Sequence, residues 1–237
     1  MRTLVLIDKL IDKDESLALL DDYADFIKEH TGIECEFYVE RRDFSFVPTT
    51  PDSDGDLKPT FDYRQKLTKE IHGRYGDYGV DNIVVWIHED NFTFKGVWGT
   101  AWAYTHFKYN LLLCRWDKDN STNTFNTLFH EGEHPHDTTI LKELGIDVNP
   151  LIAEHFGLPS FNYDRDYVHG GSPLFTYIGR AGYQRDGRML KFLAPYLRRA
   201  YALRKAKHAE HIGMLTKIVS LLSTIVSLLT KKTDAKM

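Results

Sequence analysis

The 237-residue sequence predicts an α+β domain, in which helices pack on a mixed, twisted β-sheet. Two observations lead to this prediction. Short apolar runs with strand character alternate with segments whose apolar residues recur at helical spacing. In chain order these segments read β-α-β-α-β-β-β-α, and the last helix falls at residues 121–134.

The first half of the chain supplies three strands and two helices. Residues 2–10 and 33–44 read as strands, and residues 81–90 as a third strand buried on both faces. A helix is expected at 14–32, because apolar residues follow one face and Gly32 is a stop signal. Residues 47–62 are rich in Pro, Asp and Thr and predict a loop, followed by a helix at 63–79.

Two more strands are expected at 94–107 and 108–116, before the helix at 121–134, which starts with Ser, Thr and Asn capping candidates. After His134 the chain is rich in loops, and helix returns from about Met189. This pattern predicts a domain over 1–187 and a helical C-terminal region over 188–237.

Composition and charge exclude some classes of protein. The net charge of −4 names no partner, although the segment from Arg188 to Met237 holds eleven Lys and Arg against two Asp and Glu. Cys35 and Cys114 lie in apolar, strand-like runs and predict two buried free thiols rather than a secreted disulfide framework. The N-terminal apolar run is short and predicts a strand, not a signal peptide, so a cytoplasmic location is expected.

One motif carries chemistry. Residues 130–134 read His-Glu-Gly-Glu-His, which matches both H-E-x-x-H and H-x-x-E-H. His130 and His134, four residues apart on a helix, share one face and can bind one zinc ion. A neighbouring carboxylate can take the proton of the zinc-bound water. That base is Glu131 in the forward reading and Glu133 in the inverted one.

The order of elements, ending in H-E-x-x-H, resembles the zincin metallopeptidases and in particular their metzincin-like branch, over residues 2–170. The resemblance implies a zincin-like fold and a zinc-dependent hydrolase of peptide bonds, with a peptide or protein as substrate. It favours Glu131 as the base. In such proteins an edge strand above the cleft pairs with extended substrate, and residues 96–105 occupy the corresponding position.

The third zinc ligand is open, because the metzincin continuation H-x-x-G-x-x-H is absent. His169 is the leading candidate, since Gly170 and Gly171 give the backbone freedom for a close approach. Glu154 is the second candidate, by its spacing from His134. Pro135 is expected to kink or end the helix, which makes Asp137 a partner of a histidine rather than a ligand.

The C-terminal region carries a second signal. Within residues 215–232 a 3-4 spacing of apolar residues resembles a coiled-coil seam, formed by Leu215, Ile218, Leu222, Ile225 and Leu229. This helix is expected to mediate interactions, and three modes stay open: docking on its own domain, homo-oligomerisation, or contact with a membrane surface. The alternative to an enzyme is a non-catalytic binding or regulatory protein that acts through this helix. Nucleic-acid binding is not expected, because only charge favours it.

Overall fold

The computed structural model describes residues 1–44, 47–51, 57–75, 79–88, 91, 102–106, 109–116, 121–168 and 187–234. At some positions this description covers the backbone alone: 51, 57–58, 72, 102–106, 109–110, 115, 121–123, 131, 134–135, 137–138 and 226–234. The chain forms two compact units, Met1–Ala200 and Tyr201–Met237.

A five-stranded sheet runs through the described part of the first unit, with strand order β2-β1-β5-β7-β6. The strands β1, β2, β5 and β7 are parallel, and β6 pairs antiparallel with β7 at one edge. The bounds are β1 (Arg2–Asp8), β2 (Glu36–Arg42), β5 (Asn82–His88), β6 (Trp102–His106) and β7 (Tyr109–Trp116). The predicted mixed sheet is therefore confirmed.

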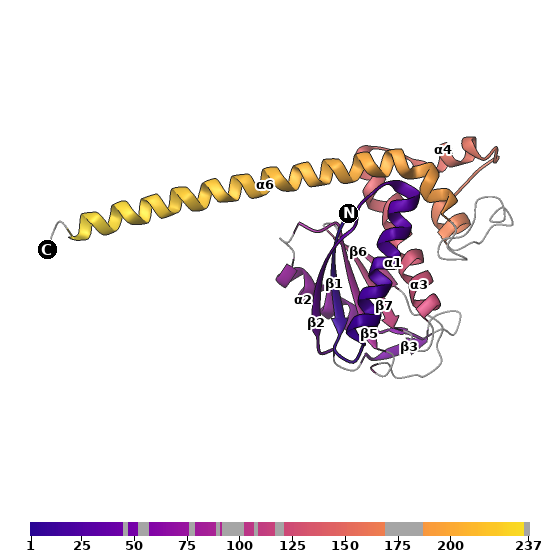
Figure 1. Cartoon of the computed structure of the whole chain (residues 1–237), viewed down its shortest axis with the longest axis horizontal. Helices are drawn as coiled ribbons and strands as arrows, with labels where there is room; N and C mark the ends of the chain where they lie inside the picture. Colours follow the sequence, from indigo (N-terminus) through magenta and orange to yellow (C-terminus); the bar gives the residue numbers. More distant parts are fainter. Residues whose placement is uncertain are drawn as a thin grey trace. The chain divides into compact units, whose positions relative to one another are not determined.

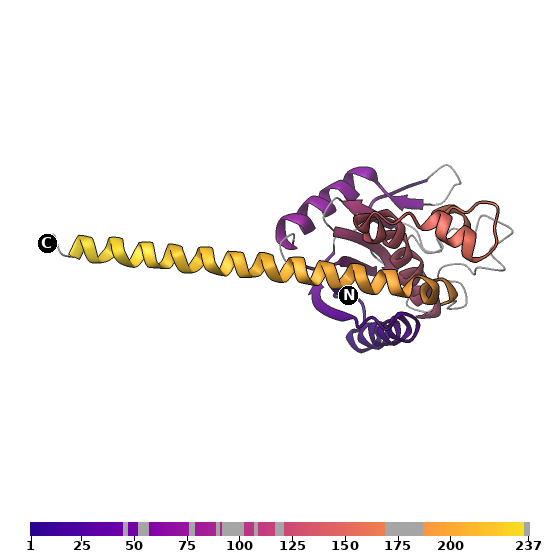
Figure 2. The same ribbon diagram turned by 90° about the horizontal axis from the view of Figure 1, so that it is seen from above.

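Helices cover both faces of this sheet (Figures 1 and 2). Helix α1 (Lys13–Thr31) and helix α3 (Ser121–Pro135) lie on one face, and helix α2 (Phe61–Tyr75) lies on the other. The coverage explains why β5 is buried along its whole length, as predicted. Asp12 caps the start of α1 by accepting hydrogen bonds from two backbone N–H groups, and Gly32 ends the helix with a φ of 72°.

The face under α2 holds a continuous apolar core. All of its members except Val47 and Val80 come from alternate positions of the strands or from one side of α2. They are Leu4, Leu6, Val47, Leu67, Ile71, Tyr75, Val80, Ile83, Val85, Ile87, Leu111 and Leu113. The other face of the same strands is left for α1 and α3, which fixes the position of the helix that carries the histidines.

The loop predicted at 47–62 is partly wrong. Within it, β3 (Thr49–Pro51) and β4 (Leu57–Pro59) pair as a separate antiparallel ribbon. Both strands contain a proline, which has no N–H group to donate to a neighbouring strand. A short two-stranded ribbon tolerates the proline, because each of its strands pairs on one side alone.

The chain after α3 is more regular than the loop-rich prediction. Up to residue 168, where the description is interrupted, it contains two π-helices, η2 (His136–Leu141) and η4 (Tyr163–Val168), the short 3₁₀-helix η3 (Lys142–Leu144) and the α-helix α4 (Val148–His155). Helix α6 (Arg188–Asp234) starts where helix was predicted to return. The predicted boundary at 187/188 coincides with the start of α6, whereas the compact units divide after Ala200.

The first turns of α6 are part of the first unit. Met189, Leu193 and Leu197 are buried. Phe192 stacks on His155 of α4 with ring centroids 4.2 Å apart. The guanidinium of Arg198 donates a 2.7 Å hydrogen bond to the carbonyl of Thr31, one of the last carbonyl groups of α1.

The second unit is described as the rest of α6. Its large apolar side chains are exposed from Leu203 to Ile225. None of the helices that the structure describes is both long and apolar enough to cross a lipid bilayer. Both cysteines are free thiols, as predicted; Cys114 is buried and Cys35 is half-buried.

Candidate metal centre

Aromatic packing against α1 determines which side of helix α3 faces the protein interior. The ring of Phe26 lies edge-on to Phe125 and to Phe129, with centroid separations of 5.7 and 4.9 Å. Phe125, Phe129 and Glu133 are each four residues apart and form the buried side of the helix. His130 comes next around the helix and is half-buried. The backbone of residue 134 lies one turn further along the same α-helix.

Gly132 allows α3 to approach α1 closely. A Cβ atom at this position would lie 2.7 Å from the hydroxyl oxygen of Tyr23, which is closer than real Cβ contacts come. Gly132 and Tyr23 also line a small void between the sheet and the two helices, together with Leu20 and Leu128. The glycine in the middle of the motif is therefore explained by packing.

Glu133 faces the protein interior. Its side chain has no exposed surface. Its Oε2 accepts a 2.7 Å hydrogen bond from the hydroxyl of Tyr163 and lies 3.3 Å from Nδ1 of His136. Its Oε1 has no hydrogen-bond partner among the described residues. A carboxylate held in this way ties the end of α3 to later parts of the chain.

The α-helix ends at Pro135, as predicted, but the chain continues directly as the π-helix η2. Pro135 has no N–H group to continue the α-helical hydrogen-bond pattern, which explains the change. The change brings His136 back toward the interior, where it is buried and pairs with Glu133. His136 was not among the expected participants, although it lies two residues after the motif.

The π-helix η4 packs on α3 and ends one residue before His169. Four of its residues, Tyr163, Asp166, Tyr167 and Val168, are almost completely buried. The backbone N–H of Tyr163 donates a 2.8 Å hydrogen bond to the side-chain oxygen of Asn149. The hydroxyl of Tyr163 reaches Glu133, so the segment that leads to His169 is anchored on the helix of the motif.

Asp166 is engaged within η4. Its carboxylate accepts hydrogen bonds of 2.6 and 2.8 Å from the guanidinium of Arg165 and one of 2.9 Å from the N–H of Asn162. The Arg165 hydrogen bonds hold the pKa of Asp166 below its ordinary value, against the opposing effect of burial. These partners engage the Asp166 carboxylate with residues of its own segment.

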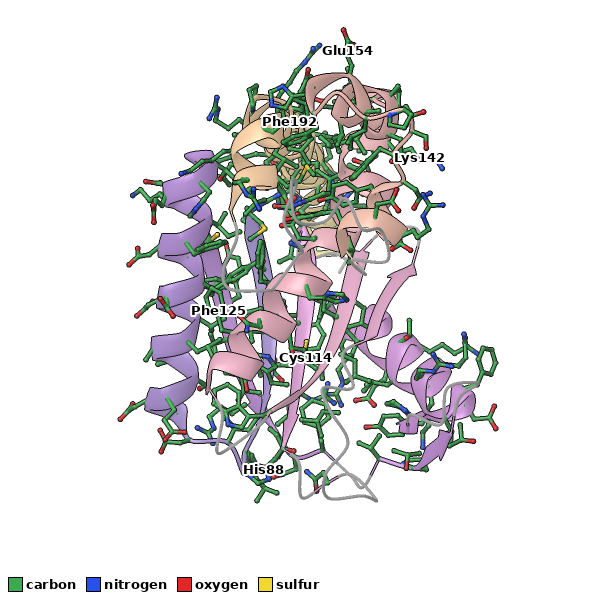
Figure 3. The ribbon with its side chains drawn as sticks, turned by 90° about the vertical axis from the view of Figure 1, so that its right-hand side faces the viewer. His88, Cys114, Phe125, Lys142, Glu154 and Phe192 are labelled. Atoms are coloured by element: carbon green, nitrogen blue, oxygen red, sulfur yellow. The ribbon has the colours of Figure 1, made fainter. Side chains whose placement is uncertain are left out.

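The other acidic and histidine residues considered for the zinc site lie elsewhere in the unit or outside the described residues. Glu154 is exposed on α4, and Figure 3 shows it projecting outward at the opposite end of the unit from His88. Asp147 caps α4 by accepting a hydrogen bond from the N–H of Asn149. The side chains of Glu131, His134 and Asp137, and the whole of His169, lie outside the described residues.

The described residues contain no group of three or more His, Cys, Asp or Glu side chains that could hold a metal ion. They do contain the helix that places residues 130 and 134 one turn apart. They also contain the buried Oε1 of Glu133, which has no hydrogen-bond partner among the described residues. Two imidazoles at this spacing suit zinc, which binds nitrogen ligands in a tetrahedral arrangement. The spacing of these two positions along α3 agrees with the expected zinc site, which stays a prediction.

Comparisons with protein-family models, with curated proteins and with solved structures found no match to this chain. Its function therefore has to be argued from its own residues. Tyr163, like His136, is a residue whose role the sequence did not reveal. The signal that could have singled it out is weak: a tyrosine in the run FNYDRDY, whose hydroxyl needs a partner when the ring is buried.

Proposed function

We propose that the chain is a zinc-dependent metallopeptidase of the zincin type. The observation that supports this best is the 2.7 Å hydrogen bond from Tyr163 to Glu133. It ties η4, whose last residue is Val168, to the end of α3, which supports His169 as the third ligand. Glu154, the competing third ligand, has an exposed side chain on α4.

His130, His134 and His169 would hold the ion. A zinc ion supplies Lewis acidity, which polarises a peptide carbonyl and makes a water molecule more acidic. His130 would contribute a zinc ligand from the margin of the buried side of α3. Its side chain is half-buried there, so a zinc ion can reach it from solvent. The contacts of α3 with Phe26 prevent the helix from turning about its axis, which keeps the imidazole of His130 in place for binding.

Glu131 is proposed as the general base, in preference to Glu133. The carboxylate of Glu133 is fully buried and already binds Tyr163 and His136. A base must exchange its proton with water and reach the substrate, which a carboxylate in this structural role does poorly. The forward reading H-E-x-x-H is therefore favoured over the inverted one.

The edge strand β6 supports a peptide substrate. It lies at the margin of the sheet, pairs only with β7 among the described strands, and contacts α3. An open strand edge can bind an extended peptide through main-chain hydrogen bonds. The predicted edge strand at 96–105 coincides with β6 from Trp102 onward, and residues 96–101 lie outside the described part.

The test is hydrolysis of a mixed peptide library by the zinc-loaded chain, compared with Glu131→Gln and Glu133→Gln variants. We expect Glu131→Gln to lose roughly a hundredfold or more of the activity while zinc is retained, because a general base contributes that much. Glu154→Gln is the matched control and should cleave like the parent. Equal activity of the parent and Glu131→Gln would contradict the assignment of Glu131.

A non-catalytic binding protein on the same fold is the second candidate, because the described part of the second unit exposes many large apolar side chains. In that case the folded chain would bind zinc but cleave no peptide in the library. Retention of zinc and the absence of cleavage by the parent chain would together favour this function.

A further inference from the structure

The second unit presents a continuous apolar face to solvent. The large apolar side chains between Ile212 and Ile225 are between 41% and 65% exposed. They are Ile212, Met214, Leu215, Ile218, Val219, Leu221, Leu222 and Ile225, which we call the apolar face of the tail helix. An exposed apolar surface of this kind marks an interaction site.

The apolar face is too wide for a two-stranded coiled coil. At 3.6 residues per turn its members span roughly half of the helix circumference, whereas a coiled-coil seam is a narrower stripe. In heptad terms, Val219 and Leu221 flank the seam of Leu215, Ile218 and Leu222. These flanking positions usually carry charges that set partner choice. The width is typical of a helix that lies with one side in an apolar medium.

The opposite face is polar but nearly uncharged. Lys217 is the only charged residue between Ile212 and Thr230. The hydroxyl of Thr216 donates a 2.9 Å hydrogen bond to the carbonyl of Ile212, and that of Thr224 a 3.0 Å bond to the carbonyl of Ser220. Because these hydroxyls find a partner on their own helix, they can enter a less polar region at low cost.

Basic residues flank this segment on both sides. Arg204, Lys205 and Lys207 precede it and Lys231 and Lys232 follow it. Residues 201–237 hold seven Lys and Arg against two Asp and Glu. Such a helix attracts anionic lipid headgroups, at about 1 kcal/mol for each basic residue near the surface. The same charges repel a second copy aligned in parallel, so a lipid surface is favoured over self-association.

We propose that residues 212–230 bind the surface of an anionic membrane, with the apolar face of the tail helix among the acyl chains and the hydroxyl face toward the headgroups. The flanking basic residues contact the headgroups. This proposal is independent of the peptidase function, since it uses no residue of α3 or η4.

The experiment is flotation of the full-length chain with lipid vesicles of phosphatidylcholine, with and without phosphatidylserine. Leu222→Gln/Ile225→Gln removes two residues of the apolar face, and Ser220→Gln/Thr224→Gln places the same side chain on the opposite face as a matched control. Glutamine is tolerated in a helix, so both variants keep the helical backbone. Circular dichroism checks this.

We expect the parent and the control to float with vesicles that contain phosphatidylserine, and more weakly with phosphatidylcholine alone. The apolar-face variant should lose roughly tenfold or more in vesicle affinity, because two large aliphatic side chains no longer leave water. Equal flotation of both variants, or no flotation of the parent, overturns the proposal. A lipid-independent oligomer of the parent that only the apolar-face variant dissociates would also overturn it and assign the face to a second copy.

Discussion

The hydroxyl oxygen of Tyr23 lies 2.7 Å from the position that a Cβ atom would take at residue 132. Tyr23 belongs to α1, is buried, and packs edge-on against Phe125 with ring centroids 6.0 Å apart. Helix packing therefore requires a glycine at residue 132, between the two histidine positions. The motif His-Glu-Gly-Glu-His thus contains one residue that serves the fold and one, Glu133, that ties α3 to η4.

Gly132→Ala is expected to destabilise the fold by about 1–3 kcal/mol, the usual cost of overpacking a core. The added methyl group forces Tyr23 out of its position between the two helices. In the Tyr23→Phe background the offending oxygen is absent, so the same substitution should cost less. Urea denaturation of the four proteins of this double-mutant cycle measures the difference.

Gly73→Ala is the matched control, because Gly73 also lies within a helix but has no atom within 4 Å of an added Cβ. It should be neutral or stabilise by up to about 1 kcal/mol through its higher helix propensity. A Gly132→Ala cost that is the same in the parent and in the Tyr23→Phe background would show that the Tyr23 hydroxyl is not the cause.

Tyr163→Phe tests the connection between η4 and α3. The variant leaves Oε2 of Glu133 without its shortest described hydrogen bond, so a loss of roughly 1–2 kcal/mol in the free energy of unfolding is expected. If η4 positions the third ligand, zinc affinity should also fall by about tenfold. Tyr196→Phe on α6 is the control, and isothermal titration with zinc is the measurement. Unchanged affinity in Tyr163→Phe would separate η4 from the metal centre.

The Arg165–Asp166 pair predicts a dependence of stability on pH. The pKa of Asp166 is lowered in the folded chain, so the pair stabilises the fold above the ordinary Asp pKa and this effect is lost as pH falls through the lowered value. Arg165→Gln should therefore unfold more easily than the parent at neutral pH. The two unfolding curves should converge in acid, whereas Lys142→Gln should follow the parent at every pH. A difference that persists in acid would indicate another cause.

Cys35 should be a slow nucleophile. Burial raises the pKa of its thiol to about 11, with a smaller opposing effect of the N-terminal charge. Because the thiolate is the reactive form, alkylation of the folded chain should be slow at mildly alkaline pH and accelerate as pH approaches 11. Peptide mapping by mass spectrometry distinguishes Cys35 from Cys114. Labelling of Cys35 that is as fast in the folded chain as in urea would contradict the prediction.

The order along the chain of the helices and of the strands of the main sheet could be predicted from the sequence, because each of these elements depends on local signals. The apolar run of β5, the capping Asp12 and the stop at Gly32 are examples. The ribbon β3–β4 was missed because its prolines, and the acidic residues between its two strands in the sequence, favour a loop by composition. The π-helices were missed because their residues have no distinctive periodicity.

The site was predictable only as far as the motif. The spacing of His130 and His134 is visible in the sequence, and both positions lie on one α-helix. The role of Glu133 was not visible, because it depends on Tyr163, thirty residues later in the chain. Contacts over such distances depend on how the elements pack, and no local pattern encodes them.

The most direct test of the proposed zinc site is the metal content of the purified chain, measured by elemental mass spectrometry. The same measurement is made on the His130→Ala, His134→Ala, His169→Ala and Glu154→Ala variants. We expect about one zinc per chain, lost in the three histidine variants and retained in Glu154→Ala. A parent chain that is folded, as judged by circular dichroism, yet binds no zinc after reconstitution would contradict it. The motif would then be a helix that serves packing alone.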